Sequence, residues 1–243
     1  MATIITYKPF GRKAILIEWI PIIALEILND IILFKDKITT QNSGFYLDFS
    51  IGYNSLTILF KENILNFQQE IETLQKIYSL KIKSLKTQNF LWEIPVCYDL
   101  EFGIDLKEMS NLSNLDISKI IEIHSKNVYT VFFIGFLPGF LYLGGLNPMV
   151  FFDRKSNPRL HVEKGSVGIG GVQTGIYPIS SAGGWNIIGK SPINFFDVDK
   201  EIPCFAKSGD QIKFNQISKE EFYDIEKLVL VNKYQLLKTI IHD

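Results

Sequence analysis

The sequence predicts an α+β protein of two domains, one over residues 1–93 and a β-rich one over residues 94–217. Two observations carry this prediction. Apolar residues in the first part switch between strand and helix periods. The second part holds many short apolar runs broken by Gly, Pro and Asn, which is typical of a barrel or a closed sandwich. The remaining segment, 218–243, begins with a helix signal, and we expect a helix that packs back on the fold.

The first part is expected to have the order β-α-β-β-α-β. Pro21 suits the first turn of a helix that runs to about Lys35. A second helix, capped by Asn63, is predicted from apolar residues at three- and four-residue spacing: Ile64, Phe67, Ile71, Leu74 and Tyr78. Strands are predicted at Lys13–Trp19, Ser43–Phe49, Ser55–Phe60 and Phe90–Val96. This order is the split βαβ, or ferredoxin-like, pattern, with two helices on one face of an antiparallel sheet.

The second part contains one predicted helix, near Asp116–Ser125, with Asp116 as its cap. The capping box of Ser218 and Glu221 predicts the start of the final helix. Strands are expected at Tyr129–Ile134, Ser166–Ile169, Trp185–Gly189, Ile193–Asp197 and Gln211–Phe214.

Composition excludes several functional classes. The formal net charge is -1, so nucleic acid is not the expected partner. Two cysteines are too few for a disulfide scaffold, and three histidines without metal-ligand spacing argue against a zinc site. The apolar run Ile15–Leu28 is interrupted by charges and a proline and is too short to cross a bilayer. The N-terminus has no signal-peptide core, so we expect a cytoplasmic protein.

Residues 184–191 match the phosphate-loop pattern G-x-x-x-x-G-K-[ST] letter for letter. The pattern needs a flexible loop whose lysine opens a helix. Here the spacer contains Trp185 and two isoleucines, which favour a strand, and Pro192 disfavours a helix after Ser191. We therefore interpret the segment as a strand that ends in a turn.

Five residues are candidates for chemistry. His124 lies on the apolar face of its predicted helix, so it is either a core histidine or a neutral imidazole that carries a proton. Arg159 could bind a carboxylate or phosphate, or it could tie a loop to carbonyl groups. Gln173 and Thr174 lie between two glycine-bearing turns, and Tyr177 can present its hydroxyl beside them, so these three could donate hydrogen bonds to a ligand.

The sequence offers few candidate nucleophiles, because no G-x-S-x-G elbow occurs.

A dense aromatic series surrounds Pro138-Gly139, from Phe132 to Phe152. Most of it must be core, but exposed rings in it would mark a partner surface.

Glycine-rich motifs between Gly135 and Pro192 carry a family resemblance. They are Gly-Phe-Leu-Pro-Gly-Phe at 135–140, Pro158-Arg159, Gly-Ser-Val-Gly at 165–168, Gln-Thr-Gly-Ile-Tyr-Pro at 173–178 and Gly-Gly-Trp at 183–185. In this order they resemble the allophanate hydrolase subunit 1-like family. Leu141 and Lys190 depart from the family pattern, which commonly has proline and arginine there.

The resemblance implies a cyclophilin-like β-barrel and the B subunit of an ATP-dependent 5-oxoprolinase, which converts 5-oxo-L-proline to L-glutamate together with its A and C subunits. His124, Arg159, Gln173, Thr174 and Tyr177 would then serve the reaction, and ATP would act in the assembled complex. Two alternatives remain open. The chain could inhibit a sensor histidine kinase, as one family member does, or it could be the carboxyltransferase-type component of a urea or allophanate system.

Overall fold

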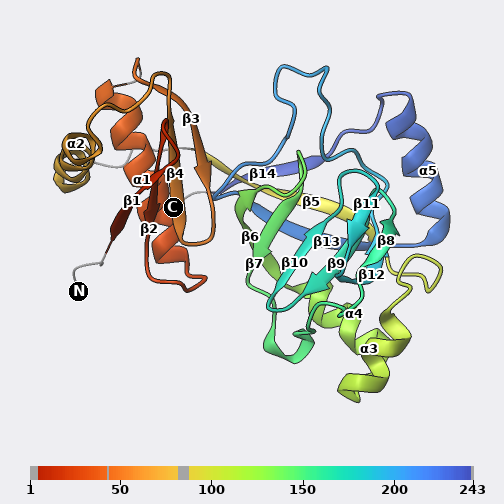
Figure 1. Ribbon diagram of the computed structural model, residues 1–243. Coiled ribbons are helices and arrows are strands. Elements are labelled where there is room, and N and C mark those ends of the chain that lie inside the picture. The colour runs from red at the N-terminus through yellow and green to blue at the C-terminus, as the bar shows by residue number, and fades with distance from the viewer. Residues whose placement is uncertain (1–4, 43, 82–87, 242–243) are drawn as a thin grey trace. The chain divides into compact units, whose positions relative to one another are not determined.

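The computed structural model describes residues 5–42, 44–81 and 88–241. The chain divides between residues 87 and 88 into two compact units (Figure 1). Each unit has its own apolar core. No helix among the described residues is long and apolar enough to span a membrane.

The first unit is an antiparallel sheet covered on one face by two helices (Figure 1). The core between them includes Ile15, Ile17 and Phe34, all fully buried. The strand order is β1-β2-β4-β3. The elements are β1 (Thr6–Phe10), β2 (Ala14–Glu18), α1 (Leu25–Asn42), β3 (Tyr46–Ile51), β4 (Ser55–Phe60) and α2 (Phe67–Ser79).

The hairpin and both helices of this unit were predicted, but their details differ. Helix α1 begins at Leu25, so Pro21 precedes the helix instead of occupying its first turn. The cap of α2 is Asn66, whose side chain accepts the N–H of Gln69 at 3.1 Å, and the prediction of Asn63 was wrong. Strand β1 was not predicted. Residue Ser43, the first of a predicted strand, lies outside the described residues.

The strand predicted at Phe90–Val96 does not join this sheet. It is part of β5 (Asn89–Cys97), which pairs in parallel with β13 (Gln211–Ile217) in the second unit. The ferredoxin-like pattern therefore lacks its last strand, and a ferredoxin-like first domain is not confirmed. Strand periodicity shows that a segment is extended, but not which distant segment it pairs with.

The second unit is a closed barrel. Its sheet runs in the order β12-β9-β10-β7-β6-β13-β5, and the pairing of Lys190 with Cys97 joins β12 back to β5. This closure confirms the barrel prediction and fits the cyclophilin-like type. The further barrel strands are β6 (Val128–Ile134), β7 (Leu141–Gly144), β9 (Ser166–Gly170), β10 (Gln173–Ile176) and β12 (Asn186–Lys190).

Smaller elements surround the barrel. Strands β8 (Arg159–Val162) and β11 (Ser181–Gly183) form a separate ribbon, and β14 (Leu237–Ile241) extends the sheet beyond β5. The helices are α3 (Leu106–Ser113), α4 (Ile117–Lys126) and α5 (Lys219–Leu230), with a single 3-10 turn at Pro148–Val150.

Two of these helices follow the sequence predictions. Asp116 stands at the N-cap of α4, and the capping box of Ser218 and Glu221 is formed at α5. Helix α3 was not predicted. The strand predicted at Ile193–Asp197 was wrong, since that segment pairs with no described strand although its burial alternates as in a strand.

One buried carboxylate fastens the barrel seam between β5 and β13. Asp210 is 1% exposed and accepts the N–H of Phe90 at 3.0 Å and the indole N–H of Trp92 at 2.9 Å. It also accepts the N–H of Lys207 at 3.1 Å. These bonds hold two segments together that lie about 120 residues apart in the chain.

Candidate functional site

An aromatic pocket of about 320 Å³ opens over the glycine-rich motifs. Phe140, Tyr177 and Trp185 form its buried wall, each 1–2% exposed, and the ring of Phe136 stands at its edge, 63% exposed. The remaining lining residues are Tyr142, Arg154, Lys155, Pro158, Ala182, Gly183 and Gly184. A small concave site with apolar walls and a few polar groups is the usual form of a small-molecule site. We refer to this site as the aromatic pocket.

The glycines of the motifs make room for the rings of this wall. A Cβ on Gly175 would lie 3.1 Å from the Trp185 ring and 2.5 Å from the carbonyl oxygen of Leu141. A Cβ on Gly183 would meet the Tyr177 hydroxyl, and one on Gly170 would meet the Trp185 indole. The clustered glycines therefore allow close approach of backbone to aromatic side chains.

Three cations lie close to the pocket, and two of them are already paired. The buried carboxylate of Asp105 binds Arg159, and it binds Lys155 at 3.1 Å. Lys155 also pairs with Glu108 at 2.8 Å. Arg154, by contrast, forms no ion pair with any described carboxylate, and its guanidinium lies 5.6 Å from the centroid of the Trp185 ring. Arg154 thus leaves a positive charge at the pocket that a ligand can neutralise.

The pocket has little acid–base capacity of its own. Burial raises the pKa of Tyr177 and of Tyr142 above the ordinary value of 10.0, and the charge of Arg154 only partly opposes this effect on both. Neither phenol ionises near neutral pH. No carboxylate and no imidazole is among the described residues that line the pocket. The arrangement can bind and orient a small anionic ring, but it offers no general base.

His124 and Thr174 are brought together, but in the core and not at the pocket. Thr174 donates its hydroxyl proton to the Gly168 carbonyl at 2.9 Å, so the bond of 2.9 Å to His124 uses the Nε2 proton of the imidazole. Nδ1 then accepts from the Tyr98 hydroxyl at 2.8 Å. Both ring nitrogens are occupied.

This environment keeps His124 neutral. The side chain is fully buried and its ring stacks on Phe214 at 4.7 Å. Desolvation by burial lowers the pKa of His124 to about 3. The placement favours the core-histidine alternative over a proton carrier that reaches a ligand.

The other three predicted site residues, Tyr177, Gln173 and Arg159, do not lie together. Tyr177 lines the aromatic pocket. Gln173 is half-buried at the start of β10, opposite Gly170. Arg159 opens β8, and besides Asp105 it bonds the Trp185 carbonyl at 3.4 Å, which favours the structural alternative for this arginine. Its link to the pocket runs through the backbone of Trp185.

Sequence reasoning missed Arg154, Lys155 and the roles of Phe136 and Trp185 in the pocket. In the sequence, Arg154–Asn157 has only the character of a polar turn before Arg159, with no motif of its own. The available signal was the aromatic series around Pro138-Gly139, because exposed rings beside an isolated cation indicate a binding site.

The phosphate-loop pattern does not form a phosphate loop. Lys190 ends strand β12, and its ammonium pairs with Glu163 at 2.5 Å. Pro192 and the irregular segment after it leave no helix N-terminus at Ser191. The interpretation of this segment as a strand that ends in a turn is confirmed.

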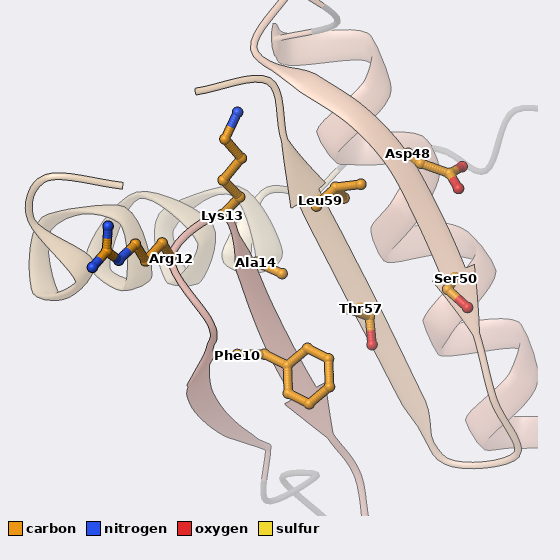
Figure 2. A pocket seen from close by; sticks show the side chains of 8 residues that line it. All are labelled: Phe10, Arg12, Lys13, Ala14, Asp48, Ser50, Thr57 and Leu59. Carbon is orange, nitrogen blue, oxygen red and sulfur yellow. The ribbon is translucent and has the colours of Figure 1, made fainter. Parts of the chain in front are cut away.

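A second hollow, of about 400 Å³, lies in the first unit on the sheet face away from the helices (Figure 2). Figure 2 shows Phe10, Ala14 and Thr57 on adjacent strands, with Arg12 and Lys13 at the turn between β1 and β2. The lining also includes Asp48, Ser50 and Leu59. No described group of His, Cys, Asp and Glu side chains in the structure could hold a metal ion.

Most of this chain matches a known protein family and several known proteins. Residues 5–206 match the family described as the carboxyltransferase domain, subdomain C and D. The chain is similar to the B subunit of 5-oxoprolinase from Haemophilus influenzae, with 34% identity over 85% of this chain and 95% of that protein. It is 45% identical to the B subunit of 5-oxoprolinase from Bacillus subtilis over 54% of this chain, and this match spans 55% of that protein's length.

The crystal structure of the Kluyveromyces lactis urea amidolyase has a similar fold. The TM-score is 0.82 at 18% identity, over 98% of this chain and 16% of that chain. At this identity the similarity concerns the fold alone.

Proposed function

The chain belongs to the carboxyltransferase domain family, subdomain C and D, and we propose that it is the B subunit of an ATP-dependent 5-oxoprolinase. The enzyme would open the lactam of 5-oxo-L-proline to L-glutamate. Water adds across the ring amide, and hydrolysis of ATP to ADP and phosphate drives this step.

The aromatic pocket is the observation that carries the proposal. A five-membered lactam ring is flat enough to lie on an aromatic wall, and its carboxylate needs a cation that is not already neutralised. Trp185 and Phe140 supply the wall, and Arg154 supplies the charge. The pocket volume of about 320 Å³ is at the small end of the range for ligand sites, which suits a substrate of this size.

The lack of a base at the pocket supports a role within a larger enzyme. Opening an amide needs a group that moves a proton to or from the reacting atoms. The titratable groups of the described lining are two phenols and the ammonium of Lys155, all with raised pKa, so none of them is a base near neutral pH and that group has to come from outside this pocket. We propose that the A and C subunits complete the site, and that this chain binds and orients the substrate.

ATP would act in the assembled complex. The segment 184–191, which carries the nucleotide-binding pattern, does not fit a phosphate, because its lysine pairs with Glu163 at the end of a strand. We therefore assign no nucleotide contact to Lys190.

The test is reconstitution. The purified chain alone should release no glutamate from 5-oxo-L-proline and ATP, and activity should appear when the A and C subunits are added. The A and C subunits without this chain are the matched control. Turnover by the chain alone would contradict the proposal, and so would an assembled complex that lacks activity.

The same preparation separates the two alternatives. Addition of urea or allophanate in place of 5-oxo-L-proline tests the carboxyltransferase alternative. Autophosphorylation of a sensor histidine kinase in the presence of the chain tests the inhibitor alternative.

A further inference from the structure

Phe136 has an unusual backbone conformation for a bulky residue. Its φ is +65°, in the left-handed region that favours glycine. The turn around it is held by hydrogen bonds from Leu137 N–H to the Gly135 carbonyl at 2.8 Å and from Phe140 N–H to the Leu137 carbonyl at 3.0 Å. Glycine would adopt this conformation without strain.

Burial does not offset this strain. The ring of Phe136 is 63% exposed, and its ring contact is the edge of Phe140 at 5.6 Å. A side chain that contributes little to the core, at a position where glycine is easier, points to a use outside folding. Strained residues of this kind cluster at binding sites, where the strain serves the site.

Arg154 is the second unusual residue at the same pocket. It lines the aromatic pocket and also the adjoining hollow of about 660 Å³ beside α3. The neighbouring cations Lys155 and Arg159 are bound to Asp105, whereas Arg154 has no ion-pair partner in the described parts of the chain. Its position over the Trp185 ring orients the guanidinium at the aromatic wall.

We propose that Phe136 and Arg154 are the ligand-binding residues of the aromatic pocket, and that together they select a small flat ring that carries a carboxylate. The ring lies against Phe136 and the aromatic wall, and the carboxylate binds the Arg154 guanidinium. This inference rests on the proposed function, since it assigns two substrate contacts within it.

The experiment compares two ligands that differ by the carboxylate, 5-oxo-L-proline and 2-pyrrolidinone. Binding to the full chain is measured by calorimetry, and the KM for 5-oxo-L-proline is measured in the complex with the A and C subunits. The variants are Arg154→Gln and Phe136→Gly. Arg12→Gln and Phe45→Ala are matched controls, because Phe45 is a comparably exposed phenylalanine (69%) and neither residue lines the aromatic pocket.

Arg154→Gln should weaken the binding of 5-oxo-L-proline by about 10- to 150-fold, as expected for loss of a charge-assisted hydrogen bond. Its effect on 2-pyrrolidinone should be small. Phe136→Gly should weaken the binding of both ligands while the melting temperature stays equal or rises, because glycine relieves the backbone strain. If Phe136 serves only the fold, the substitution should instead lower the melting temperature and leave ligand binding unchanged.

The outcomes separate this inference from the proposed function. If the wild-type complex turns over 5-oxo-L-proline and both variants keep its KM, the inference is overturned and the 5-oxoprolinase assignment stands. If the complex is inactive but the chain binds 5-oxo-L-proline with the predicted variant pattern, the assignment fails and the inference stands. Absence of 5-oxo-L-proline binding to the wild-type chain in either form overturns the inference. Binding that depends on Phe136 but not on Arg154 or the carboxylate also overturns it, and indicates docking of a partner's side chain.

Discussion

Asp105 binds Arg159 through one carboxylate oxygen, while its other oxygen accepts the backbone N–H of Ile187 at 2.6 Å. Asp105 precedes helix α3, Arg159 opens β8, and Ile187 lies in β12. A single carboxylate, 2% exposed, therefore joins three elements beside the aromatic pocket. Loss of its charge weakens the bonds to β8 and to β12 at once.

Asp105→Asn should lower the free energy of unfolding by about 3 kcal/mol, because it leaves the partly buried charges of Arg159 and Lys155 without their shared partner. Arg159→Lys should cost less, about 1–2 kcal/mol, since the charge remains and the fork geometry is lost. Urea unfolding of the purified chain measures both. Lys227→Gln, which removes an exposed ion pair with Asp224, is the control and should change little.

For Arg159→Lys the kinetics of the assembled enzyme complete the test. If Arg159 is structural, the variant should be less stable but have nearly normal kcat/KM in its folded fraction. Normal stability with a large loss of kcat/KM would instead show that Arg159 contacts the substrate.

His124 should make stability depend on pH. Its pKa is about 3 in the folded chain against an ordinary value of 6.5, so both states are neutral above pH 6.5. Below that pH the unfolded chain binds a proton that the folded chain does not, and stability falls toward pH 3 by about 1.4 kcal/mol per pH unit. His124→Gln lacks this component, and its unfolding free energy should therefore change less steeply between pH 6.5 and pH 4.

Urea midpoints at several pH values measure these slopes, with substitution of the exposed His161 by Gln as the matched control. Equal slopes for wild type and His124→Gln would contradict the prediction, as would an imidazole resonance of His124 that titrates near pH 6.5.

Lys190→Ala should leave ATP use by the assembled enzyme within a few-fold of wild type, because Lys190 ends a strand and pairs with the largely exposed Glu163. Loss of that pair should cost about 1 kcal/mol or less. Glutamate release and phosphate release at saturating ATP are the measurements. A loss of several orders of magnitude in both Lys190→Ala and Lys190→Arg, with an intact circular dichroism spectrum, would show a phosphate-binding lysine.

Gly175→Ala should destabilise the barrel by about 1–3 kcal/mol, because its Cβ would lie 2.5 Å from the backbone carbonyl of Leu141, which cannot move alone. Gly44→Ala is the matched control, since nothing lies within 4 Å of a Cβ there. Thermal unfolding compares the two variants. Equal melting temperatures would mean that the barrel adjusts at this position.

Local signals in the sequence were sufficient for several elements. The capping box at Ser218 and the position of Asp116 depend on contacts within a few residues, and both helix starts were predicted. The strand interpretation of residues 184–191 succeeded for the same reason, since side-chain preference and Pro192 act locally.

Other features depend on partners far away in the chain. Phe90–Val96 was correctly predicted as extended, but its pairing with β13 could not be read from its own residues. Ile193 and Phe195 alternate with exposed neighbours as strand residues do, yet they fill the core from an unpaired segment. Likewise the sequence does not show that Arg159 is paired with Asp105 and so is not free to bind a ligand. It also does not show that the guanidinium of Arg154 lies over the ring of Trp185.

The seam closed by Asp210 sets the order in which this protein can fold during synthesis. Phe90 and Trp92 leave the ribosome more than a hundred residues before the carboxylate that holds them. Until then β5 lacks its parallel partner β13, and that edge is open to wrong pairing. The first unit has its sheet neighbours close in sequence and can form early, whereas the barrel is a late, non-local event. We therefore expect truncation before residue 210 to yield aggregation and chaperone dependence instead of a smaller barrel.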